Sequence, residues 1–210
     1  MIVYVPQDVI DRLQDRLKTT PEKMPNALRK TINSVAKHTR KELPGRVHKV
    51  YTLESVPQRV KGASDFESAR GKQFQATIVI KGYPEPLMNF DVRKQEGEVS
   101  AKARVLQTSS LEELTLKDGG KQLKAFVQTI KNKDKQGNTS YHVGVFRRMT
   151  AEEKRKSTSE KRAPIKQLYS TSIPQMVRND EIYPQIEKDI KEELRKTLDK
   201  HIKSVMEGMK

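Results

Sequence analysis

The chain has 210 residues and a formal net charge of +15, from 42 Lys and Arg against 27 Asp and Glu, and it contains no cysteine. The lack of cysteine excludes disulfide scaffolds, thiolate nucleophiles and Cys-type zinc sites. Because only 34% of the residues are hydrophobic, we expect a single domain over residues 1–210 with a thin core that relies on partners.

The N-terminal region, residues 1–60, is predicted to be helical and basic. Apolar residues recur at helical spacing over residues 7–18, and a second helix is expected from Pro25 to Leu43, with Pro44 ending it. One sector of this second helix is apolar, and the adjoining sector is basic without any acid: Arg29, Lys30, Lys37, Arg40 and Lys41. This basic face predicts contact with an anionic partner, either nucleic acid or an acidic protein surface, and the alternative is a solubilising surface.

Residues 70–148 are predicted to form a β-rich core. Apolar and polar residues alternate over residues 74–80 and 99–105, which is typical of half-buried strands. A third strand is expected over residues 87–92, after a turn at residues 83–86, where two prolines oppose helix formation. Because the connections are short, the strands should pair antiparallel.

Residues 123–130 and 141–147 are expected to form a hairpin with a basic tip. The basic residues of this hairpin and its end are further candidates for contact with an anionic partner: Lys131, Lys133, Lys135, Arg147 and Arg148. Both phenylalanines of the hairpin are candidates for subunit contact, although packing in the core is the stronger alternative for each: Phe126 and Phe146.

The C-terminal part is predicted to consist of a charged segment over residues 149–163, then an extended arm and a long helix up to about residue 206. The charged segment lacks large apolar residues, so it should be a mobile loop or a solvated helical turn. The apolar stripe of the long helix spirals around it, so its two ends should meet different surfaces, one of them on another subunit. The extended arm could add a strand to the sheet edge of a neighbour, or it could dock on its own domain. The candidate subunit contacts of the arm and helix are Ile165, Leu168, Ile173, Met176, Ile190, Leu194, Leu198 and Ile202.

Catalytic and metal-binding patterns are missing from the sequence. The four histidines are scattered without a metal-ligand spacing, and there is no nucleophile elbow, phosphate-binding loop or dinucleotide-binding glycine motif. With no tryptophan and few other aromatic residues, base-specific recognition of nucleic acid is disfavoured. We therefore predict no catalytic residue, cofactor or metal, and an α+β protein with an antiparallel sheet, basic N-terminal helices and a long C-terminal helix.

From residue 123 onward the sequence resembles the minor tail protein Z family of tailed bacteriophages, also described as tail completion proteins. The resemblance lies in four blocks in the same order: KAFV at 124–127, HVGVFRR at 142–148, PIKQL at 164–168 and SIPQM at 172–176. A long charged helix follows. The chain differs from the family pattern at Tyr141, where a glycine is common, and has a longer charged segment before the third block.

The resemblance implies a non-enzymatic virion component, made in the bacterial cytoplasm, that acts at the head-proximal end of the tail and helps to complete the tail and join it to the head. Its partners would be other tail or neck proteins and further copies of itself in a ring, which could be sixfold. The basic face could meet the phosphate backbone of the genome, whereas no membrane or small-molecule substrate is expected. The alternative function is sequence-independent binding of nucleic acid. Charge reversal of Arg29, Lys37 and Arg40 is expected to impair assembly and leave the fold intact.

Overall fold

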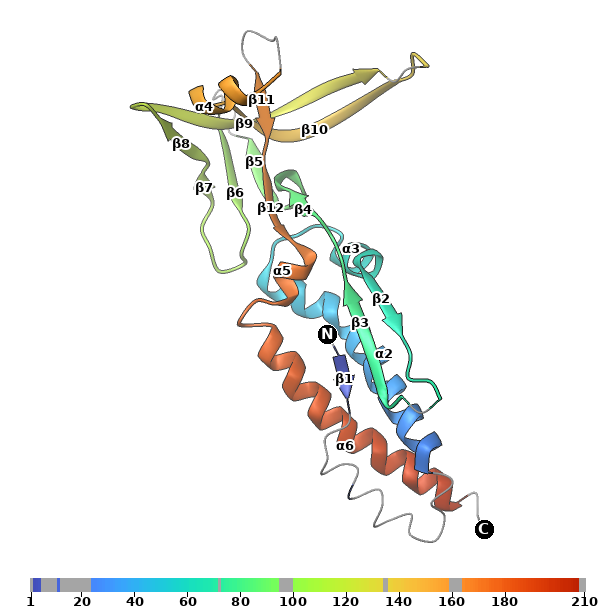
Figure 1. Ribbon diagram of the computed structural model, residues 1–210. Helices are drawn as coiled ribbons and strands as arrows, with labels where there is room; N and C mark the ends of the chain where they lie inside the picture. Colours follow the sequence, from blue (N-terminus) through green and yellow to red (C-terminus); the bar gives the residue numbers. More distant parts are fainter. Residues whose placement is uncertain are drawn as a thin grey trace. The chain divides into compact units, whose positions relative to one another are not determined.

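A computed structural model describes residues 2–4, 11, 24–71, 73–94, 100–133, 136–158 and 164–207 (Figure 1). It combines helices with antiparallel strands and ends in a long helix, which confirms the α+β class. The helix expected over residues 7–18 lies outside the described residues, apart from Asp11, which is helical. The chain divides into two compact units: unit 1 comprises Met1–Val47, Val56–Gly82 and Ile173–Lys210, and unit 2 comprises His48–Ser55 and Tyr83–Ser172.

Two long helices of unit 1, α2 (Met24–Val50) and α6 (Tyr183–Glu207), lie side by side and run in opposite directions (Figure 1). Thr31 near the start of α2 is hydrogen-bonded to His201 near the end of α6, at 2.9 Å. Arg46 near the end of α2 forms an ion pair with Asp189 near the start of α6. These contacts fix the pairing of the two helices along their length.

The apolar stripe of α6 belongs to the core of unit 1. Its side chains are 1–9% exposed: Ile186, Ile190, Leu194, Leu198 and Ile202. The last four of these were expected to contact another subunit. A buried side chain offers no surface to a partner, so Ile190, Leu194, Leu198 and Ile202 are corrected from subunit contacts to core residues. The stripe spirals, but the chain itself covers it along the whole helix.

Helix α2 continues through Pro44, which corrects the expectation that it ends there. Proline removes one backbone donor and crowds the preceding turn, which usually kinks or breaks a helix. Here the residues on either side, Leu43 and Val47, are both fully buried. Tertiary packing on both sides of the proline therefore outweighs the local cost.

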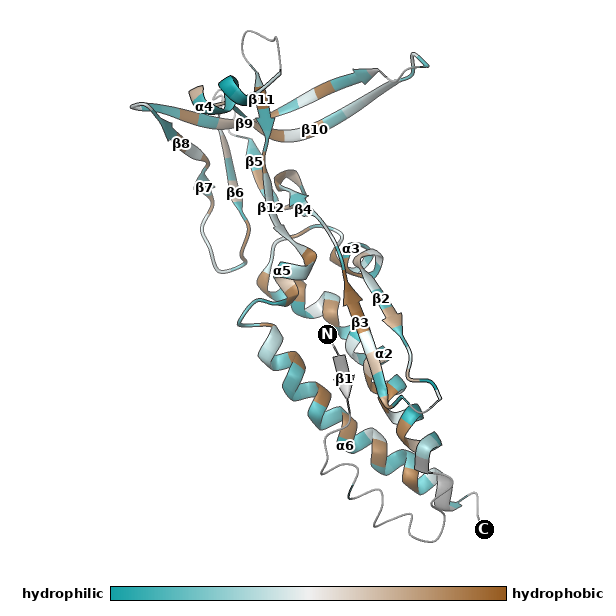
Figure 2. Cartoon of the chain, in the orientation of Figure 1, coloured by the Kyte–Doolittle hydropathy of each residue, from teal (hydrophilic) through white to brown (hydrophobic). Residues whose placement is uncertain are grey.

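The other described elements of unit 1 are a short helix, a three-stranded sheet and one further helical turn. In the sheet, the order is β1-β3-β2 and both pairings are antiparallel. Ala76 and Ile78 of β3 are buried, which confirms the predicted alternation, and Figure 2 shows β3 as hydrophobic over much of its length. The elements are α3 (Val56–Ala63), β1 (Ile2–Tyr4), β2 (Ser64–Glu67), β3 (Gln75–Ile80) and α5 (Ile173–Val177).

Helix α5 contributes to the same core. Ile173 is 1% exposed and Met176 is fully buried. Both residues were expected as subunit contacts, and both are corrected to core residues for the reason that applies to α6.

The described residues of unit 2 form three antiparallel sheets, with strand orders β11-β10-β9-β8, β12-β4 and β5-β6-β7. The predicted hairpin is confirmed as β9 and β10, which pair from residue 125 to residue 147. The elements are β4 (Pro84–Pro86), η2 (Leu87–Asn89), β5 (Asp91–Lys94), β6 (Ala101–Arg104), β7 (Glu112–Glu113), β8 (Thr115–Asp118), β9 (Lys121–Lys133), β10 (Thr139–Arg148), α4 (Ala151–Lys156), β11 (Ile165–Gln167) and β12 (Tyr169–Ser172).

The segment before β5 reverses the predicted order of turn and strand. Residues 83–86 were expected as a turn, but Pro84–Pro86 is strand β4, and the strand expected over residues 87–92 begins as the short helix η2. The fixed φ of proline suits an extended strand, and β4 pairs only with β12 among the described strands, so the missing donors are tolerated. Burial of Leu87 and Phe90 then anchors the helical turn.

Candidate functional site

A basic groove lies in unit 1 where α2, α3 and β2 meet. It has a volume of about 420 Å³. Its lining is Lys37, Arg40, Lys41 and Pro44 from α2, Pro57 and Lys61 from α3, and Ser64 and Phe66 from β2. Among these described lining residues four are basic and none is acidic. We call this set of residues the basic groove.

The local sequence explains how the groove is built. On α2, the spacing of Lys37, Arg40, Lys41 and Pro44 by three or four residues places them on one side of the helix. On β2, Ser64 and Phe66 share a face because strand residues alternate, and the acidic residues between and after them belong to the opposite face. Acidic side chains are thereby kept away from the cations.

Arg40 holds two walls of the groove together. Its Nε donates to the Ser64 hydroxyl at 3.0 Å, and a terminal nitrogen donates to the Ser64 carbonyl. The Ser64 hydroxyl in turn donates to the carbonyl of Lys61 at 3.3 Å. Because Ser64 is only 2% exposed, these bonds fix α2 against the start of β2 and the end of α3.

The three lysines of the groove differ from Arg40 in exposure and in bonding. Lys37, Lys41 and Lys61 are exposed, and in the parts of the chain that the structure describes none of them has an ion pair or hydrogen bond from its side chain. Their charges are therefore available to a partner.

The basic face predicted for α2 thus divides into separate roles. Arg29 donates to the carbonyl of Gly71 and to the side chain of Asn26. Lys30 is exposed and lies near enough to His201 to lower the pKa of that imidazole, after the larger effect of burial. Three of the five predicted residues line the groove, and these two do not.

Sequence reasoning missed the contributions of α3 and β2 to the groove. Lys61, Ser64 and Phe66 come from a segment with no motif, and their approach to α2 depends on the tertiary fold. The one available signal was the alternation of residues 64–67, in which Ser64 and Phe66 are separated by acidic Asp65.

The sign of the groove is a local property. A second groove of unit 1, between α2 and α6, is lined by Glu42, Asp189, Glu192 and Glu193 together with His38, Thr39, Arg46 and Ile186. Three of these four acids come from α6, so the two grooves that α2 lines differ in charge, and the basic groove does not follow merely from the net charge of +15.

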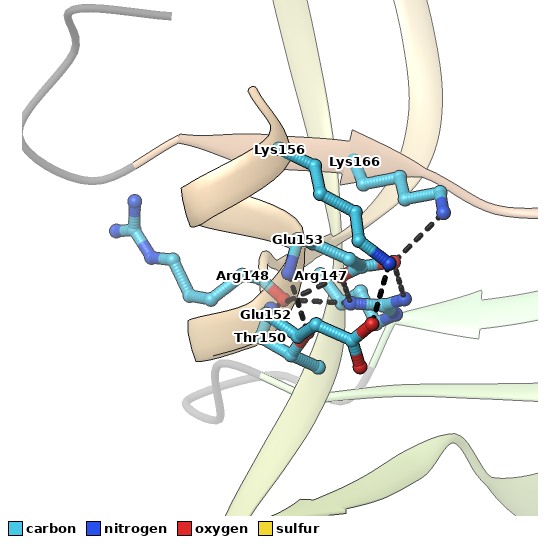
Figure 3. Close-up of polar contacts among 7 residues, drawn as sticks. All are labelled: Arg147, Arg148, Thr150, Glu152, Glu153, Lys156 and Lys166. Atoms are coloured by element: carbon cyan, nitrogen blue, oxygen red, sulfur yellow. Dashed lines mark hydrogen bonds and ion pairs between the residues drawn. The ribbon is translucent and has the colours of Figure 1, made fainter. Parts of the chain in front are cut away.

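In unit 2, Arg147 is held in an ion-pair network (Figure 3). Its guanidinium donates both terminal nitrogens to the Glu153 carboxylate, at 2.6 and 2.7 Å, and Lys166 donates to the same carboxylate at 2.8 Å. The Thr150 backbone N–H also donates to Glu153, which completes a capping box at the start of α4. Arg147 was expected to face an anionic partner, and this is corrected, because its charge is satisfied within the chain.

The pKa values of the network agree with its geometry. Hydrogen bonds from Arg147, Lys166 and the Thr150 backbone hold the pKa of Glu153 far below its usual range. The hydrogen bond to Glu153 in turn raises the pKa of the Arg147 guanidinium. Residues 149–163 were expected as a loop or a solvated helical turn, and α4 confirms the second alternative for its described part.

The other predicted residues of the hairpin differ in environment. Phe146 is 3% exposed and is therefore a core residue, which corrects it as a subunit contact. Phe126 is half-buried, with the Arg148 guanidinium 5.8 Å from its ring centre, a cation–π distance. Lys131 is exposed, while Lys135 and the side chain of Lys133 lie outside the described parts of the chain.

The arm after α4 docks on its own unit. β11 pairs with β10, and the Leu168 N–H donates to the Val145 carbonyl at 2.8 Å. Ile165 and Leu168 are half-buried, so they retain only part of their surface for a partner.

Beyond this sheet the hairpin continues as a two-stranded ribbon, made of residues 128–133 of β9 and 139–144 of β10. Within the described strands these two stretches pair only with each other. Tyr141 is 68% and Val143 45% exposed on the ribbon. Val143 shares a strand face with Val145, but the sheet that buries Val145 does not extend as far as Val143.

Comparison with known protein families, curated proteins and solved structures finds no match to this chain. None of the helices in the described ranges combines the length and the apolar character that crossing a membrane requires. In the same ranges no group of three or more His, Asp or Glu side chains is placed to hold a metal ion.

Proposed function

We propose that the chain is a non-enzymatic structural protein of a tailed bacteriophage or prophage. It acts as a minor tail or tail completion protein at the head-proximal end of the tail, where it helps to complete the tail and join it to the head. Its partners are other tail or neck proteins and further copies of itself, and its location is the virion.

The observation that carries this proposal is that three of the four blocks of family resemblance lie on neighbouring strands of one sheet. KAFV lies in β9, HVGVFRR in β10 and PIKQL in and after β11, and these strands are neighbours in one sheet. SIPQM follows from the end of β12 into α5. A sequence pattern in which three blocks form one hydrogen-bonded sheet supports a family resemblance better than scattered matches do.

The ribbon of unit 2 offers a means of assembly. Strand edges with unpaired backbone groups can accept a strand from a neighbouring protein, and alternate side chains then provide specificity. The ribbon has two such edges within the described strands, with Tyr141 and Val143 exposed on one face. An isolated two-stranded ribbon is only marginally stable in water, so a neighbour that covers it would stabilise both proteins.

The proposal is tested in the phage that encodes the chain. We expect the protein in purified particles, by mass spectrometry of gradient-banded virions, and separate heads and tails in electron micrographs after deletion of its gene. The double variant Tyr141→Glu, Val143→Glu should fail to restore plaque formation. A matched control, Tyr83→Glu with Phe74→Glu, changes two exposed aromatic side chains outside the ribbon and should restore it.

Two results would contradict the proposal. One is a protein that is missing from purified particles. The other is a deletion that leaves joined heads and tails and a normal plaque titre.

A further inference from the structure

The lining of the basic groove of unit 1 combines lysines from two helices with apolar side chains. Lys37 and Lys41 come from α2, Lys61 comes from α3, and the three apolar lining residues are Pro44, Pro57 and Phe66. Binding of an anion through charge alone would need only the lysines. A surface that binds a purely ionic partner gains nothing from the apolar part, whereas burial of apolar area stabilises a partner that carries a hydrocarbon side chain.

The groove is preorganised for such a partner. Arg40 and Ser64 join its walls through hydrogen bonds inside unit 1, so its shape does not depend on the ligand. The lysine charges remain free among the described residues. Binding to a fixed site avoids the entropic cost of ordering its walls.

The lining distinguishes a protein segment from nucleic acid. A duplex is too wide to enter a groove of about 420 Å³, so a nucleic acid that uses the apolar part of the lining would have to insert an unpaired base beside Phe66. The polar edge of a base needs hydrogen-bond partners, but the apolar part of the lining consists of two prolines and Phe66, and the Ser64 hydroxyl is already bonded twice. Leaving those polar groups unpaired is costly, whereas a hydrocarbon side chain has none to leave unpaired.

We propose that the basic groove binds an acidic segment of a partner protein that inserts one apolar side chain between flanking carboxylates. The carboxylates contact Lys37, Lys41 and Lys61, and the apolar side chain contacts Phe66 and the two prolines. This binding activity goes beyond the proposed virion role, and it holds or fails with unit 1 alone, because no part of the argument uses the ribbon or the family resemblance.

The test uses the purified full chain and short fluorescent probes, with fluorescence anisotropy at about 150 mM salt, where distant charges are largely screened. The main probe is a peptide of glutamates around one central leucine. In the comparison probes, serine replaces the leucine, glutamine replaces the glutamates, or a short oligothymidylate replaces the peptide.

Two triple variants separate the groove from net charge. Lys37→Glu, Lys41→Glu, Lys61→Glu and the control Lys191→Glu, Lys196→Glu, Lys200→Glu change three exposed lysines each. Both sets lower the formal charge equally, because each Lys→Glu change removes two charge units. Circular dichroism shows whether each variant is folded, and Phe66→Ser provides a second groove variant that keeps all the charges.

We expect the acidic leucine peptide to bind, and the groove reversal to weaken it at least about tenfold, while the control stays within about twofold. The serine and glutamine probes, and the Phe66→Ser variant, should each bind more weakly. The proposal is overturned if the leucine peptide does not bind, if both triple variants weaken it equally, or if oligothymidylate binds the groove more tightly than the peptide. These outcomes are independent of whether the protein is found in virions.

Discussion

The contact between Gly144 and Phe146 gives a direct test of how the hairpin base of unit 2 is packed. A Cβ atom at residue 144 would lie 2.9 and 3.0 Å from two ring carbons of Phe146 and 3.3 Å from Nε2 of Gln167. Carbon atoms in contact are normally about 3.5 to 4.0 Å apart. The ring cannot easily retreat, because it is 3% exposed and meets the edge of His142 at a centroid distance of 6.3 Å.

Gly144→Ala should therefore destabilise unit 2 by about 1 to 3 kcal/mol, the usual cost of overpacking a core. Urea unfolding followed by circular dichroism measures the change. Hydrogen exchange in peptides from β9 and β10 assigns it to unit 2. In a background of Phe146→Leu the smaller side chain leaves space for the new methyl group. The double variant should then be more stable than the sum of the single changes predicts, with a coupling of at least about 0.5 kcal/mol.

Additive effects of the two substitutions would refute this reasoning, and so would a neutral Gly144→Ala. The matched control is Gly45→Ala on the exposed side of α2, where a new Cβ has no neighbour within 4 Å. There the same substitution should stabilise the protein by about 0.5 to 1 kcal/mol, because alanine favours the helix.

Three other predictions follow from named contacts. Glu153→Gln should lower the free energy of unfolding by about 2 kcal/mol. Since the pKa of Glu153 is depressed in the fold, its contribution to stability is present above about pH 4.5 and is lost on acidification. The variant should therefore lack this part of the acid-induced loss of structure measured by circular dichroism. The lowered pKa of His201 favours its neutral form in the fold, so stability should be complete above about pH 6.5 and fall as the pH decreases below it; in urea titrations His201→Gln should flatten this dependence. Arg40→Ala should lower the melting temperature, because Arg40 is bonded to Ser64. Lys37→Ala lacks such a bond to lose and should change the free energy of unfolding by no more than about 0.5 kcal/mol.

Periodic patterns in the sequence predicted the regular elements well. The four-residue repeat of apolar residues gave α6, the alternation around Ile78 gave β3, and the apolar runs on both sides of the basic tip gave β9 and β10. In each case the element has one buried face, so apolar residues recur in the sequence with the period of that helix or strand. Such a pattern is local and is therefore readable without the tertiary fold.

The sequence patterns could not predict which surface each of these elements packs against. A stripe such as Ile190, Leu194 and Leu198 has the same composition whether it packs inside the chain or against a second copy. The structure places it inside. Likewise, Pro44 lies within α2 because Leu43 and Val47 are buried on both sides, and that burial depends on partners distant in the sequence.

The groove shows the same limit for charged residues, and it changes which experiment is informative. Arg29 and Arg40 share a helix face with Lys37 and Lys41, but the arginines donate to carbonyl groups of Gly71 and Ser64. A guanidinium has several donors in a fixed plane and is suited to bridging backbone carbonyls, whereas the single ammonium of lysine stays hydrated at the end of a flexible stem.

Charge reversal of Arg29, Lys37 and Arg40 would therefore break two structural contacts, so we expect this variant to lose stability as well as charge. It would confuse loss of folding with loss of binding. Reversal of Lys37, Lys41 and Lys61 changes only side chains that have no partner within the described residues. A loss of binding in that variant, with the fold retained, can then be attributed to the surface that the lysines present.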